Sequence, residues 1–421
     1  MEKDVPTVRF RTSPKNEQVI RNYTEIIMLN AKGPRIVHEM GLNYEGIYCY
    51  LNSMQPKLNN LHRLLEKLKC IHSLTVSLPD AHLENNMLLK NISLRIKHLY
   101  SLQILNLDLP YISWISLKGI EHLAGALAQM KLLKKLIMNF GHTNGIDDEC
   151  LHLLSKSLKK YKNLQSFELD ISHCEKVTKK SFKSLAWTLK HLQRPLKELC
   201  LGLARLDLIE GNALDLLASG LANLTGLQTL RINFSQLQVS SIDIYSSLMS
   251  SIKHLKSLKM LSLCFESLPM HASVLKHLAS SFESLIHLHA LSLSFGYSST
   301  FAIQEMEVLA QCLKSTASSL KNLTLDFICC SRMNDQVLEK LSIGLKALTK
   351  LSEINLQCLY CPDVGDVGIR SVTYELGGLP DLHSVNLGFS YCGPIKDTYY
   401  NELKLKKNIK SLTFDYVRSQ V

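Results

Sequence analysis

Cysteine is the residue whose spacing in this chain comes nearest to a chemical motif. Cys358 and Cys361 form a C-x-x-C pair, and Cys329, Cys330 and Cys392 are expected nearby in the fold. Such pairs can bind zinc or exchange electrons as dithiols. However, Cys330, Cys361 and Cys392 recur every 31 residues, whereas a tetrahedral zinc site needs ligands that converge from several directions. We therefore favour a structural column of buried, reduced thiols; zinc or a redox pair is the alternative.

The other residue types that commonly carry chemistry form no recognisable motif. The 16 histidines are scattered, without an H-E-x-x-H spacing. Two loops, Gly141–Gly145 and Gly365–Gly368, contain paired glycines but do not continue into a phosphate-binding motif. There is also no G-x-S-x-G elbow for a nucleophilic serine. We therefore expect a protein that is not an enzyme and that has no catalytic, cofactor-binding or metal-binding residues and no small-molecule substrate.

The elements that position these residues follow from one repeat, which organises almost the whole chain. Its pattern is L-x-x-L-x-L-x-F, with the alternation of a short strand, as in LQTLRINF from Leu227 to Phe234. The intervals between copies are 31, 31, 31, 32, 31, 31, 30, 32, 31, 31 and 27 residues. The copies begin at Ile71, Leu102, Leu133, Leu164, Leu196, Leu227, Leu258, Leu288, Leu320, Leu351, Leu382 and Ile409.

A helical pattern follows each strand at a fixed phase. Its apolar residues fall at i, i+3, i+7 and i+10, as in Leu214/Leu217/Leu221/Leu224. One strand and one helix cannot bury their apolar faces alone, so neighbouring repeats must stack into a solenoid. Because helices are wider than strands, we predict an α/β horseshoe with a parallel sheet on the concave face and helices on the convex face.

These repeats resemble the leucine-rich repeat family, in its ribonuclease-inhibitor-like class, although they are longer than that class usually has. The resemblance covers residues 44–421 and implies about 13 repeats, the last one truncated. It also implies that the protein binds another protein, as members of this family usually do. Residues 1–43 do not fit the register, and we interpret them as an N-terminal cap with a strand near Ile26–Leu29.

The distribution of charge indicates what kind of partner to expect. The net charge is +11, but many lysines lie toward the predicted carboxyl ends of helices, where cations complement the helix dipole. The outward positions of the predicted strands instead hold five carboxylates and one arginine, and no Trp or Tyr. This face is unfavourable for binding nucleic acid, which needs clustered basic residues and interleaved aromatics. It is favourable for binding a basic or neutral protein segment. The candidate binding residues are Asp108, Asn139, Glu168, Asp170, Arg231, Asn233, Asp326, Asn355, Gln357 and Asp415.

The leading functional hypothesis is a non-enzymatic interaction module or scaffold subunit that binds proteins of unknown identity. Two alternatives are a substrate receptor of a ubiquitin ligase and a GTPase activator similar to the Ran activating protein. Residues 1–43 lack the apolar helical pattern of an F-box, and the chain lacks the acidic C-terminal stretch of that activator. The chain has neither an apolar run of about 18 residues, as a membrane span needs, nor a signal-like N-terminus. Because its 12 cysteines are then expected to be reduced thiols, we expect an intracellular protein, with the cytoplasm as the favoured location, and no membrane contact.

Overall fold

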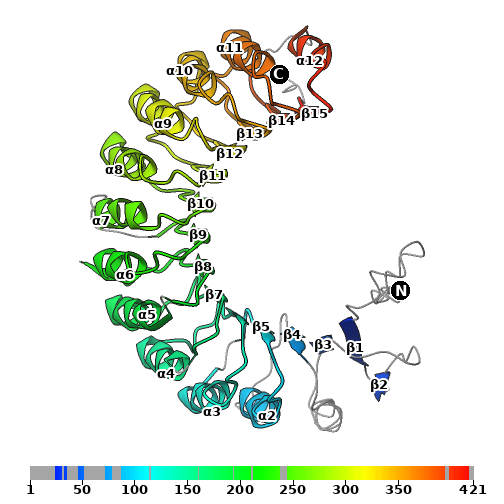
Figure 1. Cartoon of the computed structure of the whole chain (residues 1–421), viewed down its shortest axis with the longest axis vertical. Coiled ribbons are helices and arrows are strands. Elements are labelled where there is room, and N and C mark those ends of the chain that lie inside the picture. The colour runs from blue at the N-terminus through cyan, green and yellow to red at the C-terminus, as the bar shows by residue number, and fades with distance from the viewer. Residues whose placement is uncertain are drawn as a thin grey trace.

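The structure of the chain is a computed structural model. It describes residues 24–30, 33–35, 46–51, 72–77, 87–112, 115–159, 161–192, 194–209, 212–237, 244–393 and 398–416. These residues wind into an open horseshoe, with one sheet along the inner side and the helices around the outside (Figure 1). The α/β solenoid predicted from the repeat is therefore confirmed.

The sheet runs through every described repeat, and consecutive strands are hydrogen-bonded neighbours. From β3 onward every pairing is parallel and in register, so that Leu230 of β9 lies beside Leu261 of β10. The strands of the repeats are β3 (Gly46–Leu51), β4 (Ser73–Ser77), β5 (Ile104–Asp108), β6 (Lys135–Asn139), β7 (Ser166–Asp170), β8 (Glu198–Gly202), β9 (Thr229–Asn233), β10 (Met260–Cys264), β11 (Ala290–Ser294), β12 (Asn322–Asp326), β13 (Glu353–Gln357), β14 (Ser384–Gly388) and β15 (Ser411–Asp415).

Each described helix returns the chain from the end of one strand to the start of the next. Several helices begin at a side chain that caps a free backbone N–H: Asp147 accepts from Cys150 at 2.9 Å and Asn334 accepts from Val337 at 3.1 Å. The helices are α2 (Met87–Ile96), α3 (Leu117–Leu127), α4 (Asp148–Leu158), α5 (Lys179–Leu192), α6 (Ala213–Leu221), α7 (Ile244–Ser251), α8 (Ala272–Phe282), α9 (Ile303–Ser315), α10 (Asp335–Leu345), α11 (Asp366–Gly377) and α12 (Thr398–Lys404), with a short 3-10 turn η1 (Ile252–His254) after α7.

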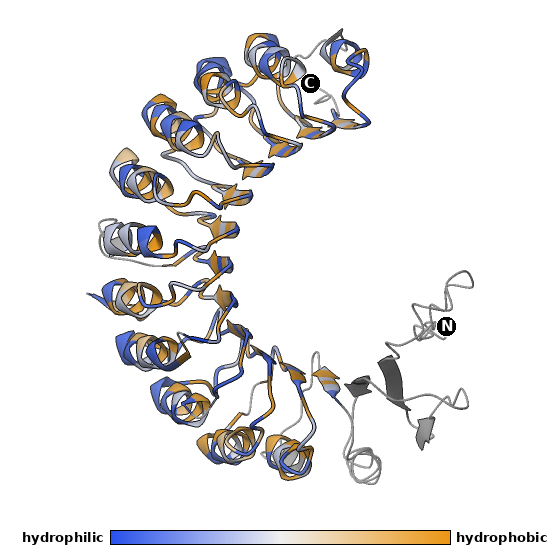
Figure 2. Cartoon of the chain, in the orientation of Figure 1, coloured by the Kyte–Doolittle hydropathy of each residue, from blue (hydrophilic) through white to orange (hydrophobic). Residues whose placement is uncertain are grey.

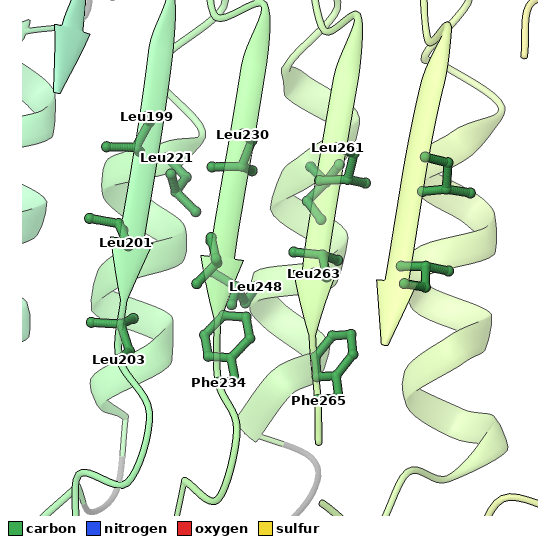
Figure 3. Packing of buried hydrophobic residues seen from close by; sticks show 14 of the residues in the cluster. Leu199, Leu201, Leu203, Leu221, Leu230, Phe234, Leu248, Leu261, Leu263 and Phe265 are labelled. Carbon is green, nitrogen blue, oxygen red and sulfur yellow. The ribbon is translucent and has the colours of Figure 1, made fainter. Parts of the chain in front are cut away.

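The hydrophobic core is one continuous layer between the sheet and the helices. The strands alternate apolar and polar residues (Figure 2), and their apolar side chains point toward the helices (Figure 3). Leu230 and Phe234 are completely buried, as the repeat predicts. Stacked phenylalanines, with ring centroids 5.6–5.9 Å apart, form a column through four repeats. The column consists of Phe234, Phe265, Phe295 and Phe327.

The N-terminal region extends the same sheet. Strand β1 (Thr24–Asn30) pairs in parallel with β3 and contains the strand predicted near Ile26–Leu29, and β2 (Gly33–Arg35) pairs antiparallel with β1. The division into a cap of residues 1–43 and a repeat domain of residues 44–421 stays a prediction. The helical pattern that follows each predicted strand also falls on residues 58–68, which lie outside the described residues.

Candidate functional site

All ten residues of the predicted concave binding face lie on strands, at positions that alternate with the inward-facing apolar residues. Eight are half-buried, and Arg231 and Asp415 are exposed. Polar side chains bond along and across the strands: the Gln357 amide donates to Asn355 Oδ1 at 2.6 Å, and Asn386 donates to the same oxygen at 2.9 Å. The face is therefore an ordered polar surface, and its role in binding stays a prediction.

Four of these ten residues also shape the turns that follow their strands. In each, the side-chain oxygen Oδ1 accepts the backbone N–H two residues further on, at 2.8–2.9 Å. This Asx turn makes the chain bend at the carboxyl edge of the sheet. The sequence analysis did not predict this role, which gives these side chains a structural function within the fold. The four residues are Asn139, Asp170, Asn233 and Asp326.

Asp108 occupies the same position in β5 but cannot form the same turn, because the residue two further on is Pro110, which has no N–H. Its carboxylate accepts instead from Ser77 Oγ at 2.7 Å and from Asn139 Nδ2 at 2.9 Å. Asp108 therefore links three neighbouring strands across the concave face.

Negative charge is concentrated over β10 to β12. Ser294 Oγ lies 3.1 Å from Glu266 Oε1 and 3.3 Å from Asp326 Oδ2, so its hydroxyl lies between two carboxylates. Burial raises the pKa of Asp326, and the nearby charge of Glu266 raises it further. A cationic group of a partner would relieve this repulsion, which is consistent with the basic or neutral segment predicted for this face.

The structure places a second set of residues along the carboxyl edge of the sheet, which we call the edge row. Each member lies three residues after its strand ends and has a positive φ of 49–60°. Nine of them donate their backbone N–H to a carbonyl of the next repeat at 2.7–2.9 Å, so the ladder of hydrogen bonds continues past the strands. The edge row consists of Tyr111, His142, His173, Arg205, Gln236, Ser267, Tyr297, Cys329, Tyr360 and Tyr391.

Rings of the edge row stack on one another in two places. The ring centroids of Tyr111 and His142 are 4.4 Å apart, and those of His142 and His173 are 3.8 Å apart. Near the other end, Tyr360 and Tyr391 stack at 4.5 Å with nearly parallel planes. The tyrosines remain exposed, with 50% of Tyr111, 51% of Tyr360 and 41% of Tyr391 accessible to solvent. The edge row thus supplies the aromatic side chains that the concave positions lack.

Charged residues of both signs lie near His173 in the edge row. Partial burial lowers the pKa of His173, and the neighbouring His142 and Arg205 lower it further, while Asp170 and Asp207 act in the opposite direction. The stacked imidazole of His173 is therefore held in its neutral form at pH 7. A neutral imidazole both donates and accepts a hydrogen bond, so it can bind a polar group of a partner.

The predicted cysteine column is present, and its interior location is confirmed. Cys330 Sγ donates to the carbonyl of Phe295 at 3.2 Å, Cys361 to that of Phe327 at 3.3 Å and Cys392 to that of Cys358 at 2.9 Å. Cys174 makes the equivalent contact in an earlier repeat, at 3.2 Å. All four are free thiols, are at most 3% exposed, and have a pKa that burial raises. The column therefore closes each turn onto the preceding repeat.

The described residues were also compared with the requirements of a metal site and of a membrane-spanning helix. Within them, no group of three or more His, Cys, Asp or Glu side chains is placed to hold a metal ion. Among the same residues, no helix is both long and apolar enough to span a membrane. The arrangement of the described residues offers surface for contact: a polar concave face and an aromatic edge.

These features define an α/β solenoid of stacked strand–helix repeats, comparable to the leucine-rich repeat horseshoe. No protein-family model matches the sequence, and the curated proteins contain no match. Among solved structures, the chain is similar to one described as the crystal structure of the Rad7 and Elc1 complex in yeast. That match has 16% sequence identity and a TM-score of 0.44, and covers 85% of this chain and 88% of the other.

Proposed function

We propose that this protein is a non-enzymatic interaction module of the ribonuclease-inhibitor-like leucine-rich repeat type, and that its protein partner contacts the edge row. The observation that carries the proposal is the set of exposed tyrosines at backbone positions where glycine would be the unstrained choice. Tyrosine is enriched at the centres of protein interfaces, because it combines a large apolar ring with a hydrogen-bonding hydroxyl.

The backbone conformation strengthens this argument. An L-residue in the left-handed region costs about 1–2 kcal/mol relative to the right-handed one, and glycine avoids that cost. Stacking of Tyr360 on Tyr391 offsets part of it, since an aromatic pair contributes about 0.5–1.5 kcal/mol. Tyr297 is 60% exposed and has the same backbone conformation, and no stacking on another ring is found for it among the described residues. Its side chain forms a hydrogen bond with Cys329, and most of its ring stays accessible to a partner.

The test compares a variant of the edge row with a variant of the convex side. Replacing Tyr360 and Tyr391 by asparagine removes both rings, and asparagine tolerates the left-handed conformation. The control is Tyr374→Asn on α11, where the tyrosine is 75% exposed on the convex side. Affinity purification with quantitative mass spectrometry should find partners that the wild type and Y374N retain and that Y360N/Y391N loses.

Thermal unfolding of the three proteins accompanies the purification, to show that each is folded. An identical set of partners for the wild type and the double variant would refute a role for the edge row. Specific turnover of a substrate by the purified protein would refute the non-enzymatic assignment.

A further inference from the structure

The convex side has a groove that neither the concave face nor the edge row explains. It lies between the neighbouring helices α4 and α5, on the outside of the horseshoe (Figure 1). Three lysines, a tryptophan and a histidine contribute to its walls, together with two carboxylates at one end. The lining residues are Asp148, Glu149, His152, Ser155, Lys156, Lys180, Lys183, Ser184 and Trp187.

Trp187 provides apolar surface at this groove. Its side chain is 37% exposed, although tryptophan is usually well buried. Lys159 Nζ lies 5.8 Å from the centre of its ring, and the ring of His191 lies 4.1 Å away. His191 is itself fixed by a 2.8 Å contact between Nδ1 and the carbonyl of Trp187. The indole is therefore held in one orientation at the surface.

The lysines of the groove are available to a ligand. Lys156, Lys180 and Lys183 are exposed and form no ion pair with any residue that the structure describes. Of the two carboxylates, Asp148 is already engaged: it accepts hydrogen bonds from the backbone N–H groups of Thr178 and Ser181 and from their hydroxyls. Glu149 is the other carboxylate, so three lysines outnumber two carboxylates in the lining and the net charge at the groove is positive.

Helix stability explains Lys156, which lies in the last turn of α4, but it does not explain Lys180 and Lys183. Helix α5 begins with Lys179 and Lys180, and Lys183 follows in the next turn, whereas α4, α10 and α11 have acidic residues in their first turns. Cations at a helix N-terminus lie at the positive end of its dipole and destabilise it. The predicted pairing of lysines with helix carboxyl ends therefore holds for Lys156 but not for Lys180 and Lys183, and this exception favours anion binding at the start of α5.

The size of the surface indicates a peptide. Helix α6, the next along the solenoid, has no lysine, and its exposed side chains include Asp215 and Ser219. The basic surface therefore follows α5, whose 14 residues span about 21 Å at 1.5 Å per residue. Nucleic acid would favour a longer basic track with several aromatics.

We propose that the α4–α5 groove binds an acidic, amphipathic segment of a protein partner. Carboxylates of the segment pair with Lys156, Lys180 and Lys183, and an apolar side chain packs on Trp187. The groove is a second interaction surface, between helices of the convex side and not at the carboxyl edge of the sheet, and it does not depend on the function proposed for the edge row.

The experiment measures fluorescence anisotropy of a labelled 14-residue peptide, as long as α5, with glutamates on one helical face and leucines on the other. Lys180→Glu/Lys183→Glu should weaken its binding to the full chain about tenfold, since two attractions become repulsions. This variant puts acidic residues in the first turns of α5, so its helix should be at least as stable. Trp187→Ala should weaken binding separately.

The matched control is Lys253→Glu/Lys256→Glu, which makes the same change in net charge at exposed lysines after α7. It should leave the affinity within about twofold of the wild type, because exposed charges beyond a Debye length are screened. Equal weakening by both double variants, or the absence of peptide binding to the wild type, would overturn the proposal. A 14-nucleotide oligothymidylate that binds more tightly than the peptide, and is lost with K180E/K183E, would also overturn it, in favour of nucleic acid.

Discussion

Thiol reactivity offers a sharp test of the cysteine column, because the chain supplies its own control. Burial raises the pKa of Cys392 from 9.0 to about 11 and that of Cys330 from 9.0 to about 12. Since the thiolate is the nucleophile, each unit lowers its fraction at pH 7 tenfold. The thiolate fraction should therefore fall about 100-fold at Cys392 and about 1000-fold at Cys330 relative to an unperturbed thiol. Steric protection slows the reaction further.

The assay is a series of short pulses of N-ethylmaleimide on native protein, read by mass spectrometry of the peptides. Cys329, next to Cys330, is half-buried and belongs to the edge row. It should label in the native state, while Cys330 and Cys361 label only when the repeats open. Unfolding in urea should make all of these positions react quickly.

The outcome that refutes the structural interpretation is equally specific. If Cys330 or Cys361 reacted in native protein as fast as Cys329, the column could not be a buried packing element. Zinc bound in stoichiometric amount and lost on Cys361→Ser would revive the metal alternative. Normal folding with slow native labelling would agree with thiols that hydrogen-bond to the backbone of the preceding repeat.

Three further predictions concern stability. Leu230→Asp should lower the free energy of unfolding by several kcal/mol, because it buries an unpaired charge between two repeats; an unchanged urea transition would contradict the register. Phe295→Ala should cost about 3–5 kcal/mol, and hydrogen exchange should place the loss at β10 to β12, whereas Tyr297→Ala should cost far less. Burial raises the pKa of Asp148, but its hydrogen bonds with Ser181 and Thr178 outweigh this effect and lower the pKa below 3.8. The ionised carboxylate should therefore stabilise the fold fully above that value, and this stabilisation should be lost as the pH falls through the lower pKa of the folded state. In an acid titration, the free energies of unfolding of Asp148→Asn and the wild type should converge.

The fold could be predicted because every repeat of a solenoid packs its strand and its helix in the same way. The leucine register fixes which side chains point inward at each strand, and the following helical pattern fixes what covers them. Residues such as Leu230 and Phe234 were identified correctly for this reason. Parallel pairing also follows, because each strand is followed by a helix that carries the chain back.

The site was harder to predict, because one side chain can both face outward from the sheet and hydrogen-bond with the backbone of the following turn. Alternation correctly placed Asp170 and Asp326 on the outward side of the sheet, but it does not show that each also accepts a backbone N–H two residues on. The edge row was missed because its backbone conformation carries no composition signal: tyrosine, histidine and cysteine occupy a place that usually favours glycine. Its only signal in the sequence is its regular position: each member lies two residues after the fourth apolar position of the repeat pattern, as Tyr360 does.

Because the horseshoe is curved, neighbouring repeats are closer together on the concave face than on the convex face. Strands repeat about every 4.8 Å along the inner side, which is why rings of consecutive repeats can stack there, whereas packed helices outside are about 8–10 Å apart and leave grooves. Two inner repeats span about 9.6 Å, close to the about 9.3 Å of one three-residue turn of a polyproline II helix at about 3.1 Å per residue. A segment in that conformation lying across the strands would therefore present the same side to the edge row after every third residue. Such a surface would select partners whose sequence has a three-residue period.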